Sequence, residues 1–194
     1  MQRMDTHHST PHRPDTAALT RQALQLALRV LDLAEVHRKP HDMCQATTQV
    51  ARCLKALGDS ASAEQYLKQA MRWTAQMHGV DARVDLLCEL AEISCLIAEQ
   101  AGRDDDNRAC HAALERARDH SFEAARMASH TADAHWQIKV LLRASDVLNR
   151  CGDHHDATGM QDQAITLIGL TPGPDGGAEA ARDTDFATAS ALLM

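Results

Sequence analysis

"LKALGDSASAEQYLKQAM" (residues 54–71) and "LNRCGDHHDATGMQDQAI" (residues 148–165) share a pattern that predicts the fold. A Gly-Asp pair stands at the same place in both stretches, at 58–59 and at 152–153, and alanines follow at matched positions. Glycine ends a helix in the left-handed conformation, and an aspartate after it favours a turn into the next helix. Each stretch therefore predicts a helical hairpin with a short turn, in which the alanines let the two helices pack closely.

A weaker third copy, "ELAEISCLIAEQAG", ends at Gly102, so we expect the repeat turns at glycines 58, 102 and 152, spaced 44 and 50 residues apart. The 3.6-residue period of apolar side chains predicts seven helices. They run from Asp15 to near Pro40 and over about 41–57, 61–77, 82–101, 106–128, 132–151 and 155–169. In the first helix the expected apolar stripe consists of Leu19, Ala23, Leu26, Val30, Leu33 and Val36.

The composition agrees with an all-α fold of about seven antiparallel helices. The 194 residues are rich in Ala and Leu, and Gly and Pro are scarce before residue 171. The aromatic residues are Tyr66, Trp73, Phe122, Trp136 and Phe186. A sheet would need more aromatic and β-branched residues than this. We expect a helical domain over 15–170, a disordered tail with three histidines over 1–14, and a flexible Pro/Gly-rich tail over 171–194.

The pattern G-D-x3-A-x6-A in both stretches resembles the tetratricopeptide repeat (TPR). Residues 63–79, "AEQYLKQAMRWTAQMHG", are similar to the longer repeat of kinesin light chains and of many bacterial sensor and regulator proteins. The resemblance covers 43–77 and 137–169, and 83–129 loosely. The chain departs from the family in lacking the usual helix-A aromatics and the terminal Pro, and its spacing exceeds the usual ~34 residues. The resemblance implies helical hairpins stacked as a right-handed α-solenoid.

A TPR-like array implies a concave groove lined by the first helix of each hairpin. Mapped onto this chain, the residues that we expect to bind a peptide there are Gln45, Thr48, Arg52, Lys55, Lys139 and Asn149. The same mapping assigns Glu89, Glu92, Leu96 and Glu99 to the middle repeat. Arg52 and Lys55 suit a carboxylate or an acidic peptide segment, because charged donors bind anions well in a partly dry groove. The competing interpretation is that these residues form the solvated faces of amphipathic helices.

The implied function is a non-catalytic scaffold or adaptor that binds a peptide or protein partner, with an acidic segment or a C-terminal carboxylate as the expected ligand. Such a function is compatible with a monomer and with a homo-oligomer. The sequence contains no GxSxG, P-loop, HExxH, GxGxxG or ExxH motif, so we expect no enzyme activity and no cofactor. The formal net charge is −7 with no basic stripe, which argues against a nucleic-acid partner.

Cys151, His154 and His155 are weak candidates for a metal site beside the last repeat turn. The first copy of the repeat carries Leu57, Ser60 and Ala61 at the same positions, so the turn forms there without metal ligands. We therefore expect a turn and no metal. A metal- or ligand-responsive helical domain that uses some of the 12 histidines is the alternative function, and a small-molecule-binding or enzymatic bundle is the third.

Six cysteines without a CxxC motif indicate a reduced, cytoplasmic setting. No apolar run approaches 18 residues, so we expect neither a membrane span nor a signal peptide. The segment "FATASALLM" (186–194) is a further hypothesis, because a short apolar end on a flexible linker is suited to docking on its own chain or on a neighbour.

Overall fold

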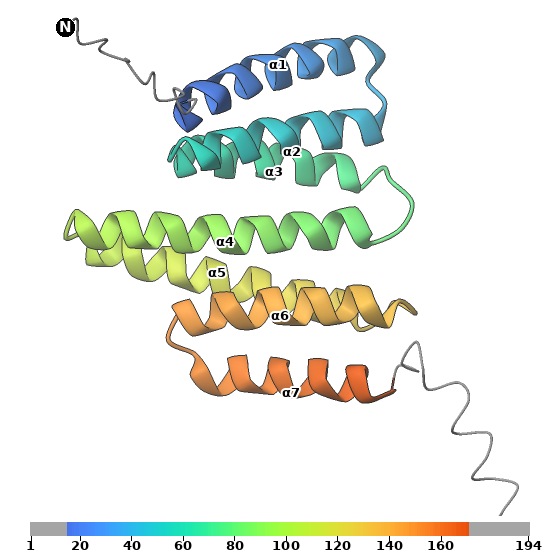
Figure 1. Ribbon diagram of the computed structural model, residues 1–194, viewed down its shortest axis with the longest axis vertical. Coiled ribbons are helices and arrows are strands. Elements are labelled where there is room, and N and C mark those ends of the chain that lie inside the picture. The colour runs from blue at the N-terminus through green and yellow to red at the C-terminus, as the bar shows by residue number, and fades with distance from the viewer. Residues whose placement is uncertain (1–14, 171–194) are drawn as a thin grey trace, which may run out of the picture. The chain divides into compact units, whose positions relative to one another are not determined.

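The computed structural model describes residues 15–170, and every regular element within them is an α-helix (Figure 1). The helices are α1 (Thr16–His37), α2 (Pro40–Ala56), α3 (Ser60–Thr74), α4 (Asp81–Arg103), α5 (Asn107–Ala128), α6 (Ala134–Arg150) and α7 (His154–Leu170). The expected all-α class is confirmed. The predictions for 1–14 and 171–194, including docking of 186–194, lie outside the described residues.

The helices form two compact units that divide between Met77 and His78. The first unit holds α1, α2 and α3, in which α2 packs against both α1 and α3. The second unit holds α4 to α7, in which α4 pairs with α5, α6 pairs with α7, and α6 also packs against α4 and α5. Figure 1 shows α4/α5 and α6/α7 as antiparallel hairpins with short turns.

The turns of the three hairpins share one design. The main-chain N–H of Asp59 donates to the carbonyl of Leu54 at 3.0 Å, and Asp153 donates to Leu148 at 2.9 Å in the same way. The residue before each aspartate has a positive φ, 86° at Gly58 and 83° at Gly152, as expected for glycines that end a helix. The two repeat turns predicted from the Gly-Asp pairs are therefore present.

The middle turn differs from the prediction, because Gly102 does not end its helix. α4 continues through Gly102 to Arg103, and the residue with positive φ is Asp105, at 57°. The N–H of Asp106 then donates to the carbonyl of Ala101 at 2.9 Å, which is the bond made by Asp59 and Asp153. Aspartate is one of the few residues besides glycine that adopt this conformation. The turn therefore lies three residues after the expected Gly102.

With the turn at 105, the repeat has a constant length. The left-handed residues stand at 58, 105 and 152, so both steps are 47 residues long instead of 44 and 50. The middle-repeat positions that match Gln45, Thr48, Arg52 and Lys55 become Glu92, Cys95, Glu99 and Gly102. Two sets of small residues confirm the new register, because Ala51, Ala98 and Ser145 are all buried, as are Ala70, Ala117 and Ala164.

Aspartates begin four of the helices. The side chains of Asp59, Asp106 and Asp133 each accept a hydrogen bond from the backbone N–H three residues later, at 2.9 to 3.0 Å. The Asp15 carboxylate accepts from Ala17 N at 3.1 Å. These bonds satisfy N–H groups that have no partner in the first turn of a helix. At these four helices the predicted starts agree with the observed ones to within two residues.

The packed face of α1 is not the predicted stripe. Ala27, Leu31 and Ala34 are buried against α2, whereas Leu19, Leu26, Val30, Leu33 and Val36 are 51% to 76% exposed. Apolar side chains cover a wide arc of α1, and the period alone does not say which part of the arc faces a neighbour. The arc that includes the small side chains of Ala27 and Ala34 packs on α2, since alanine permits a close approach.

Two clusters of buried residues in the second unit include side chains of α6. One joins Ala91 and Cys95 of α4, Ala117 of α5 and Val147 of α6, and the half-buried Cys151 packs against it. The other joins Ala125, Leu141, Ala144, Leu148, Ala157, Met160 and Ala164 from α5, α6 and α7. Alanines at these contacts explain how few large side chains suffice to pack four helices.

Candidate functional site

The predicted peptide-binding residues of the first unit lie along one side of α2. Gln45 and Arg52 are exposed, and Thr48 and Lys55 are half-buried. The hydroxyl of Thr48 donates to the carbonyl of Cys44 at 2.7 Å, so its donor is used within the helix. The two cations lie three residues apart and therefore share a helix face.

Gln45 also borders a groove of about 540 Å³ between α1 and α2. One wall consists of Val30, Leu33, Ala34 and His37 from α1, and the other of Asp42, Gln45, Ala46 and Gln49 from α2. The groove thus has a largely apolar wall opposite a largely polar one. Val30 and Leu33 of the apolar wall belong to the exposed apolar stripe of α1.

Lys139 and Asn149, the remaining predicted binding residues, lie on α6 in the second unit, and both are exposed. The Oδ1 atom of Asn149 is 3.1 Å from Nδ1 of His154. Asn149 therefore contacts the start of the next helix across the repeat turn.

The three weak metal candidates at this turn have different surroundings. The Sγ atom of Cys151 lies 4.0 Å from Sγ of Cys95, while the ring of His154 contacts Asn149 and His155 is exposed. Within residues 15–170, no group of three or more His, Cys, Asp or Glu side chains is placed to hold a metal ion.

The acidic residues that the mapping assigned to the middle repeat are paired with arginines of α6. Arg143 donates to Glu92 at 2.7 Å and lies 3.8 Å from Glu89, and Arg150 donates to Glu99 at 2.6 Å. Both bonded pairs are 51 residues apart, one repeat plus one helical turn. These carboxylates therefore already have cationic partners within the unit, and the sequence analysis missed Arg143 and Arg150.

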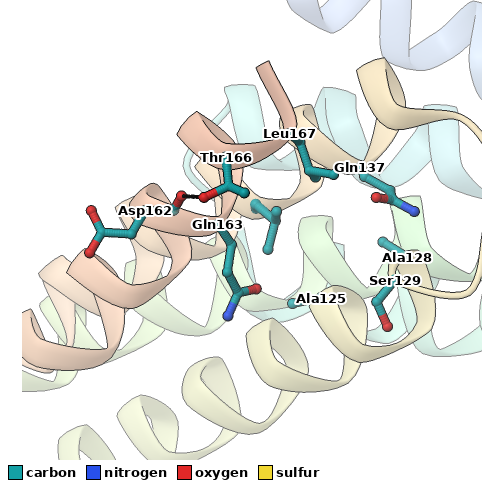
Figure 2. A pocket seen from close by; sticks show the side chains of 9 residues that line it. Ala125, Ala128, Ser129, Gln137, Asp162, Gln163, Thr166 and Leu167 are labelled. Carbon is teal, nitrogen blue, oxygen red and sulfur yellow. Dashed lines mark hydrogen bonds between the residues drawn. The ribbon is translucent and has the colours of Figure 1, made fainter. Parts of the chain in front are cut away.

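A pocket that the sequence did not indicate lies between α5, α6 and α7 (Figure 2). Its volume is about 380 Å³, and it is lined by Ala125, Ala128, Ser129, Gln137, Leu141, Asp162, Gln163, Thr166 and Leu167. Ala125, Ala128 and Leu141 are buried core residues that form its apolar part. The small residues near the end of α5 leave the space that larger side chains would fill.

The polar groups around this pocket are mostly occupied. Ser129 donates to the carbonyl of Arg126 at 2.8 Å, Thr166 to that of Asp162 at 2.8 Å, and Gln137 to that of Thr131 at 2.5 Å. The side-chain amide of Gln163 makes no hydrogen bond within the described part of the chain, and Figure 2 shows it beside the pocket. The pocket thus combines an apolar part with the amide of Gln163 and the carboxylate of Asp162, and it is suited to an apolar side chain and its adjoining main chain.

No protein-family model and no curated protein matches this chain. Among solved structures, it is similar to BtubC (BKLC) from P. vanneervenii over 84% of this chain and 95% of that one, with 14% sequence identity and a TM-score of 0.27. None of the helices within residues 15–170 has the length and apolar character needed to cross a membrane.

Proposed function

We propose that the protein is a non-catalytic, cytoplasmic scaffold that binds a peptide or protein partner, and that the pocket between α5, α6 and α7 takes an apolar side chain of that partner. The pocket is the observation that carries this proposal. Its volume of about 380 Å³ lies at the lower end of the range for ligand pockets, which suits one or two side chains. Apolar anchors that fill such pockets supply most of the affinity in many interfaces.

The lining of the pocket supports binding over catalysis. It contains no His, Cys or Lys, its one ionisable side chain is that of Asp162, and the hydroxyl of Ser129 donates to a main-chain carbonyl. A serine nucleophile needs its hydroxyl proton directed at a base, whereas the Ser129 hydroxyl donates to the carbonyl of Arg126. The amide of Gln163 is suited to bonding the main chain of a bound peptide, since it carries both a donor and an acceptor.

A second part of the proposal concerns Gln45, Thr48, Arg52 and Lys55 on α2, together with Lys139 and Asn149 on α6. The resemblance to TPR arrays and the exposed Arg52 support the binding of an acidic segment or a C-terminal carboxylate by the α2 residues. The exposed apolar stripe of α1 supports self-association as an additional mode of assembly.

The experiment is a selection of binders from a displayed library of random 16-residue peptides, followed by fluorescence polarisation with the enriched peptides. The pocket variant is Gln163→Trp, which fills the pocket with an indole. The matched control is Ile165→Trp on the same helix, where the native side chain is 64% exposed and does not line the pocket. Arg52→Glu/Lys55→Glu tests the α2 face in parallel.

We expect enriched peptides with an apolar anchor, a loss of at least tenfold in affinity for Gln163→Trp, and wild-type affinity for Ile165→Trp. Binding that survives Gln163→Trp but fails in the Arg52→Glu/Lys55→Glu variant moves the site to α2. If the library yields no binder while methyl resonances of Ala128 and Leu141 shift with small apolar compounds, the pocket is a small-molecule site and the scaffold proposal is wrong.

A further inference from the structure

Of the six cysteines, all of which lie within residues 15–170, Cys95 and Cys151 are the two whose sulfur atoms are in contact, at 4.0 Å. Cys95 stands in the middle of α4, and Cys151 directly follows the last residue of α6. A disulfide needs the sulfur atoms about 2.05 Å apart, so each must move by about 1 Å. The cluster around them contains the small side chains of Ala91 and Ala117.

The two thiols differ in their access to solvent. Cys95 is 1% exposed, whereas Cys151 is half-buried at the repeat turn. A small dissolved oxidant therefore meets Cys151 first, and Cys95 is placed behind it as a partner. The buried Cys44 and Cys88 have no such arrangement, and burial raises the pKa of both thiols, that of Cys88 to about 11.

The charges around the pair favour a thiolate on Cys151. The contact with Cys95 lowers the pKa of Cys151, and the guanidinium groups of Arg118 and Arg150 lower it further, against burial and the Asp153 carboxylate. The same contact and burial raise the pKa of Cys95. Either sulfur can be the donor in the 4.0 Å contact, and Sγ of Cys151 also lies 3.7 Å from the carbonyl oxygen of Leu114. Arg118 is held at this place by its ion pair with Asp153 of the same turn.

We propose that Cys95 and Cys151 form a peroxide-reactive dithiol that closes to a disulfide between α4 and the end of α6. The Cys151 thiolate attacks one oxygen of hydrogen peroxide, the O–O bond breaks, and the products are a sulfenic acid on Cys151 and a hydroxide ion that takes up a proton. The Cys95 sulfur then attacks the Cys151 sulfur, the S–O bond breaks, and a second water leaves with the Cys95 proton. Two thiols and one peroxide give one disulfide and two waters.

This site shares no residue with the lining of the proposed peptide pocket. In a reducing compartment such a disulfide is transient and redox-sensing. Closing the bond ties the α4/α5 hairpin covalently to the α6/α7 hairpin, across the cluster that contains Val147. A reductant such as a dithiol reverses the reaction by exchange.

In the test, the reduced chain of residues 1–194 is treated with equimolar hydrogen peroxide. Its thiols are then counted in denaturant, and its peptides are mapped by mass spectrometry. We expect two of the six thiols to disappear, a Cys95–Cys151 linked peptide, and recovery of both thiols with dithiothreitol. In Cys95→Ser, dimedone traps a sulfenic acid on Cys151. Cys110→Ser, which removes the other half-buried cysteine, leaves the linked peptide unchanged.

The peptide map of the wild-type chain tests the proposed disulfide even if a serine variant does not fold. A disulfide that joins other cysteines, oxidation of Cys151 beyond the sulfenic acid without a link to Cys95, or six intact thiols after treatment would each overturn the proposal.

Discussion

One substitution, glycine to alanine, should have opposite effects at two positions of the second unit. Gly102 lies within α4 with helical φ, and a Cβ there meets the Cys110 sulfur at 4.0 Å, an ordinary contact. Alanine is favoured over glycine within a helix by about 0.8–1 kcal/mol, and somewhat less near a helix end. Gly102→Ala is therefore expected to stabilise the protein by about 0.5–1 kcal/mol.

Gly152 has a φ of +83°, and a Cβ there has no neighbour within 4 Å. The penalty of Gly152→Ala is therefore conformational, because an L-residue loses about 1–2 kcal/mol in the left-handed region. Part of this penalty is offset because alanine gives the unfolded state less conformational entropy than glycine does. We therefore expect a net loss of about 1 kcal/mol in the free energy of unfolding.

The assay is thermal and urea unfolding of both variants followed by circular dichroism at 222 nm. For a chain of this size, 1 kcal/mol corresponds to about 2–4 °C in Tm, so the two variants should differ by about 3–8 °C. A lower Tm for Gly102→Ala would refute a helix that continues to Arg103 and would restore the repeat turn to Gly102. Asp105→Gly provides an independent check, since it should raise the Tm by relieving the non-glycine residue at φ 57°.

Three further predictions test the packing and the caps. Leu31→Ala should lower the free energy of unfolding in urea by about 3 kcal/mol, because the Leu31 side chain is only 7% exposed. Leu33→Ala should change it by less than about 0.5 kcal/mol, because Leu33 is 65% exposed. Equal losses would place both leucines on the packed face. Ser145→Ala should raise the free energy of unfolding by about 1 kcal/mol in the same assay, since the buried Ser145 hydroxyl has no hydrogen-bond partner in the described structure. Alanine stands at the equivalent positions 51 and 98 of the other repeats. A loss of stability would reveal a hydrogen bond to that hydroxyl. Asp59→Ala should cost about 1 kcal/mol at pH 7. Hydrogen bonds from Ser62 lower the pKa of Asp59 below its ordinary value of 3.8. The stability difference between the wild type and Asp59→Ala should therefore be complete above pH 3.8 and vanish as the pH falls through the lowered pKa. Unfolding curves from about pH 7 to about pH 2 measure this difference, and a constant value would exclude the cap.

The sequence was sufficient for the helices and for two of the three turns, because both follow from local chemistry. A glycine at a helix end and an aspartate after it act within a few residues, and their effects do not depend on the rest of the chain. The third turn was misplaced because Asp105 adopts a conformation in which glycine is far commoner. The spacing of the three aspartates at 59, 106 and 153 was the signal that could have corrected it.

The packed face of α1 could not be chosen from the sequence. Leu31 and Leu33 are both leucines on one apolar arc, and only the approach of α2 distinguishes them. The same limit applies to the pocket between α5, α6 and α7, which is a space left between three helices and has no motif. Whether the residues predicted on α2 and α6 bind a peptide stays a prediction.

The cysteine pair and the arginine pairs depend on which helices are neighbours. Arg143 and Glu92 are 51 residues apart, so their pairing follows only once the 47-residue repeat is known. Cys95 and Cys151 are 56 residues apart. Both stand in predicted helices, where a cysteine is expected to act as a small apolar residue. Knowledge of the repeat length converts such distant residues into candidates for contact.

The constant interval between the turns also indicates where the protein tolerates engineering. α3 and α4 contain 15 and 23 residues, whereas α5 and α6 contain 22 and 17, yet both segments fill the same 47 positions. The short α3 precedes the long α4 and the long α5 precedes the short α6, so the helix lengths nearly compensate each other. The connections 75–80 and 129–133 therefore shift in position but differ by only one residue in length, while the turns stay fixed. Because Ser129 borders the pocket, 75–80 is the better place for an affinity tag, a fluorophore or an inserted domain.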